Sequence, residues 1–238
     1  MSRILLKLSG EALSGDKGFG FDESTVYRVA KEIAVLSGKG AEIAIVIGGG
    51  NFWRGRSSGD MDRVAADQIG MLATVMNCIY MSDMLRRCGL ETVVMTSFPC
   101  GSLARAYNRD SAVKNLSKKR IVLFAGGTGH PYFSTDTSTV LRALEINADS
   151  MLLAKAVDGI YTADPRKDSN ARKYDRISID EVVEKKLSAL DMAASIMCME
   201  NGMPFAVFKL QGEDSILRAM PDSDGNFPKD FDGTIVTA

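Results

Sequence analysis

The stretch Ile43-Ala-Ile-Val-Ile47, followed by Gly48-Gly-Gly-Asn51, decides the fold class. Five consecutive apolar residues run directly into three glycines and an asparagine. Apolar side chains at successive positions, rather than at every second one, are typical of a strand covered on both faces. The run IVLF at residues 121–124 has the same character. We therefore predict an α/β fold, a three-layer α/β/α sandwich around a mostly parallel central sheet.

Short apolar runs alternate with longer helical patterns along the rest of the chain, which indicates consecutive strand, helix and strand units. No linker or repeat divides the sequence, so we expect one domain over residues 1–238. The segment 99–117 shows little pattern. Strands are expected at 3–8, 41–47, 91–95, 120–124, 150–153, 204–208 and 234–236, and helices at 24–37, 63–88, 136–146, 179–186, 191–201 and 214–220.

Composition and charge argue against several classes of protein. The 29 Lys and Arg residues against 30 Asp and Glu leave a net charge of -1, so nucleic acid is not expected as the primary partner. Four cysteines without a CxxC pair, and a single histidine, argue against structural zinc. The N-terminal apolar run is too short for a signal peptide, and no later segment offers the ~20 apolar residues of a membrane span. We expect a soluble, cytoplasmic protein with no membrane partner.

Three predicted strands end in loops of small residues: Ser9-Gly10-Glu11, Gly48 to Asn51, and Gly126-Gly-Thr-Gly129. The carboxyl ends of parallel strands meet at one edge of a sheet, where ligands collect. Glycine lets backbone N–H groups approach phosphate oxygens closely. A single loop of this kind is more often a plain tight turn, but three at corresponding strand ends predict a polyphosphate site.

The familiar phosphate-binding motifs are missing. No GxxxxGK[ST] is present and no GxGxxG opens a helix, which argues against P-loop kinases and Rossmann dehydrogenases. The hydrolase signature HExxH is missing as well. Lys7 remains, near the end of an apolar strand and directly before Ser9 and Gly10. We expect its ammonium group in the phosphate crevice, rather than in solvent as for a lone strand-edge lysine.

Two carboxylates accompany this lysine. Asp191 precedes a helical pattern, where aspartate is a natural N-cap, and a cap is compatible with a catalytic role. Two roles, orienting Lys7 and binding Mg²⁺ through water, are open to both carboxylates, and Asp136 has the further alternative of capping the helix predicted to begin there. The sequence does not decide between them.

Eight motifs in order resemble those of the bacterial uridylate kinases (UMP kinases), which belong to the amino acid kinase superfamily. KLSGE and GGGN alone indicate only the superfamily, whereas ADQIGMLATVMN and GTGHPYFSTD indicate the uridylate branch. The resemblance runs essentially end to end. The motifs are RILLKLSGEAL (3–13), GFGFD (18–22), VIGGGNFWRG (46–55), RVAADQIGMLATVMN (63–77), AGGTGHPYFSTD (125–136), VDGIYTADPRKD (157–168), ALDMAAS (189–195) and GTIVTA (233–238).

The resemblance implies reversible transfer of the γ-phosphoryl group of ATP to UMP, in pyrimidine nucleotide biosynthesis. Mg²⁺ is expected with ATP, bound mainly through the nucleotide phosphates and not by His or Cys ligation. The expected catalytic residues are Lys7, Asp136 and Asp191. The expected ATP contacts are Lys7, Leu8, Ser9, Gly10, Gly50, Arg54, Tyr161 and Asp164, and the ATP side of the domain is expected mainly in its C-terminal part. The expected UMP contacts, in the N-terminal part, are Gly49, Asp67, Thr128, Gly129, His130, Pro131, Tyr132, Phe133, Ser134 and Thr135.

Some positions depart from the family pattern. His130 stands where relatives commonly carry asparagine, and we expect it to shape the UMP pocket. Lys155 and Ala156 stand where many relatives have a polar residue against adenine, which leaves the adenine contacts open. Trp53 is expected to serve in packing or a subunit contact.

In the helix predicted at 64–85, apolar residues cover more of the circumference than the single stripe by which a surface helix packs on its own domain. The remaining apolar surface predicts a contact with another copy of the chain, and so a homo-oligomer. The alternative is a helix buried within one chain. The resemblance implies a hexamer and, in some members, activation by GTP and inhibition by UTP.

Two other functions stay open beside the UMP kinase. The first is a superfamily enzyme with a carboxylate, carbamate or isopentenyl phosphate acceptor, and Asp67 together with GTGHPYF argues against it. The second is a nucleotide-sensing regulatory protein without turnover, and Lys7 and Asp191 argue against that.

Overall fold

The computed structural model describes residues 2–53, 59–165, 167–222, 225–229 and 231–237. Within these residues, nine strands form one sheet in the order β4-β3-β5-β2-β1-β6-β8-β9-β7. Neighbouring strands are parallel except β8 and β9, which are antiparallel. The mostly parallel sheet predicted from the sequence is confirmed. The strands are β1 (Arg3–Leu8), β2 (Glu42–Ile47), β3 (Thr92–Thr96), β4 (Arg105–Ala106), β5 (Ile121–Ala125), β6 (Ser150–Lys155), β7 (Arg176–Ser178), β8 (Phe205–Lys209) and β9 (Thr234–Thr237).

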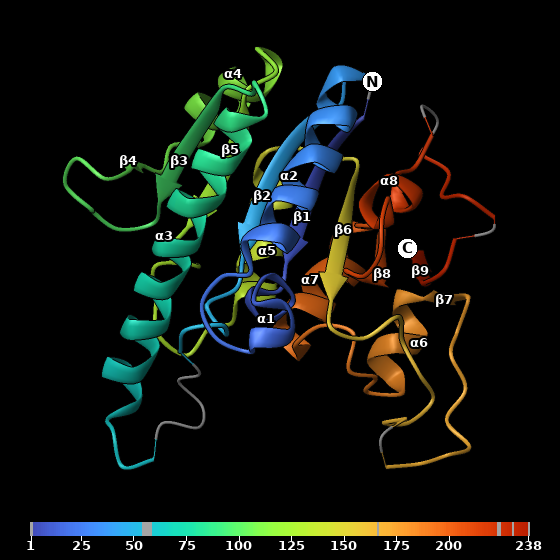
Figure 1. Cartoon of the computed structure of the whole chain (residues 1–238). Coiled ribbons are helices and arrows are strands. Elements are labelled where there is room, and N and C mark those ends of the chain that lie inside the picture. The colour runs from blue at the N-terminus through green and yellow to red at the C-terminus, as the bar shows by residue number, and fades with distance from the viewer. Residues whose placement is uncertain (1, 54–58, 166, 223–224, 230, 238) are drawn as a thin grey trace.

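Helices cover both faces of the sheet because successive strand residues point to opposite sides. In β1, Ile4, Leu6 and Leu8 pack with residues of α2, α3 and α8, whereas Leu5 packs with residues of α4 to α7. Figure 1 shows α2 and α3 crossing in front of the sheet. The helices are α1 (Gly10–Leu13), α2 (Glu23–Gly38), α3 (Arg63–Arg87), α4 (Arg109–Ser117), α5 (Thr135–Glu145), α6 (Ile179–Glu184), α7 (Met192–Asn201) and α8 (Ser215–Ala219), with a 3-10 turn at Gly15–Lys17.

The predicted strands and helices are all present, with ends displaced by a few residues. The structure adds α1, α4, β4 and β7. Helix α4 lies in the segment 99–117, which shows little pattern. The pattern is weak there because the helix buries only Ala112, Asn115 and Leu116. Its start is fixed by Asn108, whose side chain accepts a hydrogen bond from the Ser111 backbone N–H at 2.9 Å. A short helix held by a cap and few apolar contacts gives a weak periodic signal.

Among the described helices, α3 alone has a length and composition that would let it cross a membrane. The prediction that no segment offers an apolar stretch of that length is therefore wrong for α3. In the fold, however, α3 packs against the sheet, and Val75, Cys78, Met81 and Leu85 are part of a core shared with α2 and β1. Along the face that packs against the sheet, α3 is therefore a core helix.

The sheet places Lys7 near its centre. Strand β1 lies between β2 and β6, and Lys7 is in register with Val46 on one side and Leu153 on the other. The parallel strands β1, β2, β5 and β6 all end at the same edge, where the polyphosphate site is expected.

Candidate active site

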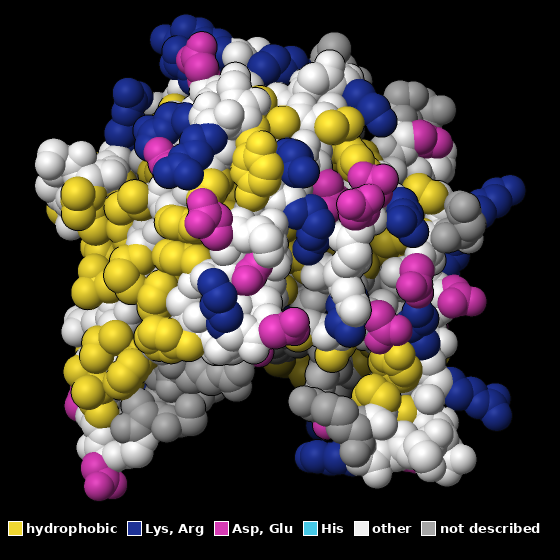
Figure 2. All heavy atoms as spheres, in the orientation of Figure 1, with side chains coloured by type: hydrophobic (Ala, Val, Ile, Leu, Met, Phe, Trp, Pro, Cys, Tyr) yellow, Lys and Arg dark blue, Asp and Glu magenta, His cyan; other side chains and the backbone are white. Residues whose placement is uncertain are grey.

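Two cavities open at the carboxyl ends of the parallel strands. The first, about 490 Å³, is lined by residues that follow β2 and β5 and by the first half of α3. The second, about 340 Å³, is lined by residues 157–165 after β6 and by residues 185–188. Figure 2 shows a hollow at the lower edge of the molecule, between the N-terminal end of α3 and the loop that follows β6.

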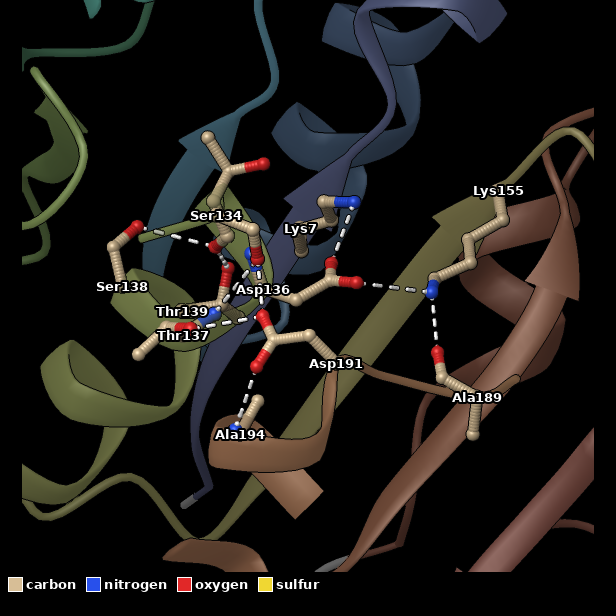
Figure 3. A network of polar contacts seen from close by, with 11 residues as sticks. Lys7, Ser134, Asp136, Thr137, Ser138, Thr139, Lys155, Ala189, Asp191 and Ala194 are labelled. Atoms are coloured by element: carbon tan, nitrogen blue, oxygen red, sulfur yellow. Dashed lines mark hydrogen bonds and ion pairs between the residues drawn. The ribbon is translucent and has the colours of Figure 1, made fainter. Parts of the chain in front are cut away.

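A cluster of two lysines and a carboxylate lies at the ends of β1 and β6 (Figure 3). Lys7 Nζ lies 2.8 Å from Asp136 Oδ1, and Lys155 Nζ lies 3.4 Å from Asp136 Oδ2. Lys155 also donates to the carbonyl oxygen of Ala189. All three charged side chains are largely buried. One carboxylate therefore holds two ammonium groups, and the cluster keeps a net positive charge that suits phosphate oxygens.

Burial and charge act against each other in this cluster. Burial by itself would raise the pKa of the Asp136 carboxyl, but Lys7 and Lys155 outweigh it and lower that pKa to about 2. Burial lowers the pKa of Lys155, and the attraction of Asp136 only partly opposes that effect. Asp136 is consequently ionised throughout the neutral range.

Asp191 joins the N-terminal ends of two helices. Its Oδ1 accepts a hydrogen bond from the Ala194 backbone N–H at 2.9 Å, so the predicted N-cap of α7 is confirmed. Its Oδ2 accepts from the hydroxyl of Thr137 at 2.8 Å and from the hydroxyl of Ser134. Both hydroxyls belong to the start of α5. Asp191 thus fixes α5, and with it the Asp136 backbone, relative to α7.

Ser134, and not Asp136, caps α5. The Ser134 hydroxyl oxygen accepts from the backbone N–H of Asp136 at 3.0 Å. The alternative that Asp136 serves as the helix cap is therefore wrong. Asp136 lies one residue inside the helix, which leaves its side chain to contact the lysines.

The loops after β1 and β2 pack closely against each other at the rim of the crevice. A Cβ atom on Gly10 would lie only 2.4 Å from the carbonyl oxygen of Gly48, so only glycine fits at that position. Ser9 follows β1 directly and precedes α1. The Leu8 side chain is buried in the core, and its backbone carbonyl accepts from the Gly48 N–H at 3.0 Å. Leu8 thus offers the crevice no side chain.

The first cavity brings together most of the residues expected around UMP. It also contains residues that the sequence analysis did not assign to the acceptor: Gly50, Trp53, Gly70, Met71, Thr74 and Gly127. His130, expected to shape the pocket, is on its wall. Gly129, Pro131 and Tyr132 are not on the wall. The expected acceptor residues that line it are Gly49, Asp67, Thr128, His130, Phe133, Ser134 and Thr135.

Asp67 connects α3 to the loop after β5. Its Oδ2 accepts from Arg63 Nε at 2.8 Å and from the backbone N–H of Tyr132, also at 2.8 Å. The Tyr132 side chain is exposed, and Arg63 lies over its ring at 5.2 Å. Asp67 therefore holds one wall of the cavity in place in addition to lining it.

The second cavity contains the two residues expected near adenosine. Tyr161 and Asp164 are both on its wall, and the Tyr161 hydroxyl donates to Asp158 Oδ1 at 2.9 Å. Lys185, Lys186 and Leu187 form the opposite wall and were not anticipated. Arg54, expected to contact ATP, lies outside the described residues.

Lys155 is the main site residue that the sequence analysis missed. It was noted only as a departure in the adenine region, yet it contacts the same carboxylate as Lys7. The available signal was its position, because Lys155, like Lys7, stands at the carboxyl end of an apolar parallel strand.

The carboxylates fit a metal ion that arrives with a phosphate ligand better than one held by protein alone. No group of three or more Asp, Glu, His or Cys side chains that could hold a metal occurs in the part of the chain that the structure describes. Asp136 is paired with lysines, and Asp191 accepts from hydroxyls and a backbone N–H. Mg²⁺ would take most of its oxygen ligands from phosphates and water.

Comparison with known proteins gives the family and its structural relatives. The profile of the amino acid kinase family matches residues 2–209. A UMP kinase from Bacillus anthracis is similar with 35% identity and a TM-score of 0.90, over 99% of this chain and 96% of that one. A UMP kinase from Ureaplasma parvum is similar with 31% identity and a TM-score of 0.89, over 100% and 99%. A uridylate kinase from Archaeoglobus fulgidus, at 24% identity and a TM-score of 0.73 over the full length of both chains, shares the fold.

Proposed function

The chain belongs to the amino acid kinase family, and we propose that it catalyses the reversible transfer of the ATP γ-phosphoryl group to UMP, forming ADP and UDP, in pyrimidine nucleotide biosynthesis. The observation that carries this proposal is the cluster of Lys7, Asp136 and Lys155. It lies at the same edge of the sheet as the two cavities, although none of its three residues is on the wall of either. Full-length similarity to two UMP kinases supports the choice of acceptor.

The chemistry of phosphoryl transfer asks for what this cluster provides. The transition state is loose, so catalysis depends on positioning the reactants and neutralising charge rather than on a strong base. Lys7 and Lys155 would contact the phosphate oxygens, and Asp136 would orient both ammonium groups. Asp191 would act indirectly by fixing the start of α5. Mg²⁺, bound through the phosphates, would neutralise part of their charge.

Each cavity suits one substrate. We assign UMP to the first cavity, where the N-terminal end of the 11-residue helix α5 offers a favourable dipole for phosphate, while Ser134 accepts from the backbone N–H groups of Asp136 and Thr137. We assign the adenosine of ATP to the second cavity, beside Tyr161 and Asp164. The acceptor side then comes mainly from the N-terminal half of the chain, and the donor side mainly from the C-terminal half.

The test is ADP formation from MgATP with UMP, CMP, aspartate and acetylglutamate supplied in turn. We expect turnover with UMP that exceeds turnover with the other three acceptors. Preferential use of aspartate or acetylglutamate would instead indicate another enzyme of the family. Nucleotide binding without turnover on any acceptor would indicate a sensor.

We also propose that α3 forms an interface between copies of the chain. Ile69, Leu72 and Met76 recur on one side of the helix and are 37%, 53% and 47% exposed. Figure 2 shows apolar side chains gathered along this side of the molecule. Apolar surface of this kind usually marks a subunit contact, and the family resemblance suggests a hexamer. Light scattering tests this: a mass near the 25.7 kDa of one chain would contradict any oligomer, and a dimer would contradict the hexamer.

Activation by GTP and inhibition by UTP stay predictions from the resemblance, and adding each nucleotide to the ADP assay tests them. A cytoplasmic location is likewise proposed. It is consistent with Cys78, Cys88, Cys100 and Cys198, all of which are free thiols.

A further inference from the structure

The segment 160–174, of which the structure describes 160–165 and 167–174, is here called the donor loop, and its residues 160–165 line the second cavity. Both Tyr161 and Asp164 belong to it. Its two ends run antiparallel: the Tyr174 N–H donates to the Ile160 carbonyl at 2.9 Å, and Tyr161 bridges to Lys173. Ile160 and Tyr174 therefore form a narrow base, and the geometry of that base positions Tyr161 and Asp164, which follow it directly.

A single buried hydroxyl connects this base to β9. Thr234, which is fully buried, is the first residue of β9. Its Oγ1 accepts from the Ile160 backbone N–H at 2.8 Å and donates to the Tyr174 carbonyl oxygen. Gly159 also lies close to this hydroxyl, since a Cβ atom on Gly159 would lie 2.6 Å from the same oxygen. One hydroxyl thus satisfies a donor at one end of the loop and an acceptor at the other.

We propose that Thr234 is a positioning residue for the donor nucleotide, because its hydroxyl fixes the base of the donor loop and so holds Tyr161 and Asp164 against the second cavity. The inference rests on the proposed function, in which that cavity takes the adenosine of ATP. Thr234 lies in the GTIVTA motif, to which the sequence analysis gave no role.

The strand itself does not depend on this hydroxyl. Strand β9 pairs with β8 on one side and with β7 on the other through its backbone. The Ile235 N–H also donates to the Asp175 carbonyl at 2.9 Å. Removing the Thr234 hydroxyl while keeping its shape should therefore leave β9 in place.

The other side-chain contacts near the donor loop are weak substitutes. Lys173 Nζ lies 2.6 Å from Asp232 Oδ1, but that carboxylate is almost fully exposed, and exposed ion pairs contribute little. The second contact of Lys173, with Asp158, is longer at 3.3 Å. Backbone hydrogen bonds from Tyr174 N–H to the Ile160 carbonyl and from Thr162 N–H to the Arg172 carbonyl would remain. Loss of the buried hydroxyl would nevertheless leave the Ile160 N–H unpaired and loosen the attachment of the base to β9.

The test compares three variants by direct titration of ATP and of UMP, and by KM and kcat. Thr234→Val keeps the branched shape without the hydroxyl, Thr234→Ser keeps the hydroxyl, and Thr237→Val is the control at the exposed end of the same strand. We expect Thr234→Val to weaken ATP about tenfold, the equivalent of one lost hydrogen bond, and to change UMP binding less than about twofold. Its KM for ATP should rise more than its kcat falls, Thr234→Ser should recover most of the affinity, and Thr237→Val should match wild type.

The outcomes separate the inference from the proposed function. Wild-type protein that does not bind ATP would refute the proposed function whatever the variants do. Wild-type protein that binds ATP while Thr234→Val binds it equally well would refute the positioning role. An equal loss of ATP and UMP affinity would also refute it, and would make Thr234 a residue of general stability. If Thr234→Val does not fold, Thr234→Cys is judged by the same ratio of ATP to UMP affinity.

Discussion

Replacing Asp136 by asparagine removes the negative charge that lies between Lys7 and Lys155. In the native protein this carboxylate contacts one lysine at 2.8 Å and the other at 3.4 Å, with all three side chains largely buried. The variant keeps the size and shape of the side chain but leaves two neighbouring ammonium groups with no charge to balance them. We expect a large loss of stability that depends on pH.

The magnitude follows from the burial. Removing one partner of a buried ion pair costs about 3 to 5 kcal/mol, because the remaining charge is left uncompensated. Since Asp136 serves two lysines, we expect about 4 kcal/mol, which for a chain of this size corresponds to a fall in Tm of roughly 10 °C.

The pH dependence has a definite sign. The pKa of Lys155, already below its ordinary value of 10.5 through burial, falls further when the carboxylate is gone. At pH values below 10.5, the Lys155 side chain is then protonated less often in the folded variant than in the unfolded chain. Because the unfolded chain binds more protons, the free energy of unfolding of the variant rises as the pH is raised from 7 toward 10. In wild type the contribution of Asp136, whose pKa falls from 3.8 to about 2, is complete above pH 3.8 and is lost as the pH falls through 2.

Urea unfolding at pH 7 and pH 9 measures both effects. Asp110→Asn is the matched control, because Asp110 is paired with Arg109 but 84% exposed, and it should behave like wild type. The reasoning is refuted if Asp136→Asn loses less than about 1 kcal/mol, or if its stability rises with pH no more steeply than that of wild type.

Three further predictions concern the site and the core. Lys7→Ala should lower kcat by about 10²-fold or more while the protein stays folded, and turnover within a few-fold of wild type would exclude Lys7 from the mechanism. Asp67→Asn should weaken UMP by roughly 1 to 3 kcal/mol and leave ATP nearly unchanged in separate titrations; an equal loss for both would make Asp67 a residue of the fold. Cys78 and Cys198, whose thiol pKa burial raises to about 12, should resist thiol reagents at pH 8 until urea unfolds the protein, and labelling in the native state would contradict their burial.

The central strands were predictable because their burial on both faces leaves an unbroken apolar run. Strand β7, with three residues, was not, since it is held by pairing with β9 and has no run of its own. Strand β7 therefore lies where tertiary contacts, rather than a local sequence pattern, fix the backbone.

The same distinction explains the site. Lys7 and the glycine loops were predictable because strand ends in a parallel sheet meet at one edge. Lys155 was missed because the expected strand ended at Leu153, whereas β6 continues for two residues and carries Lys155 to the crevice. The role of Asp136 depended on where α5 begins, and a shift of the cap to Ser134 turned a possible cap into a partner for two lysines.

The position of β9 has a consequence for the order in which the protein becomes functional during synthesis. Thr234 lies 74 residues after Ile160 and 60 residues after Tyr174, the two ends that it holds together. A nascent chain that has emerged as far as β8 already contains Lys7, Asp136, Lys155 and the lining residues of the first cavity. Its donor loop, by contrast, still lacks the Thr234 hydroxyl that contacts both ends of the base. On a translating ribosome, the donor loop would therefore gain its contact with Thr234 only after the lining residues of both cavities have been made.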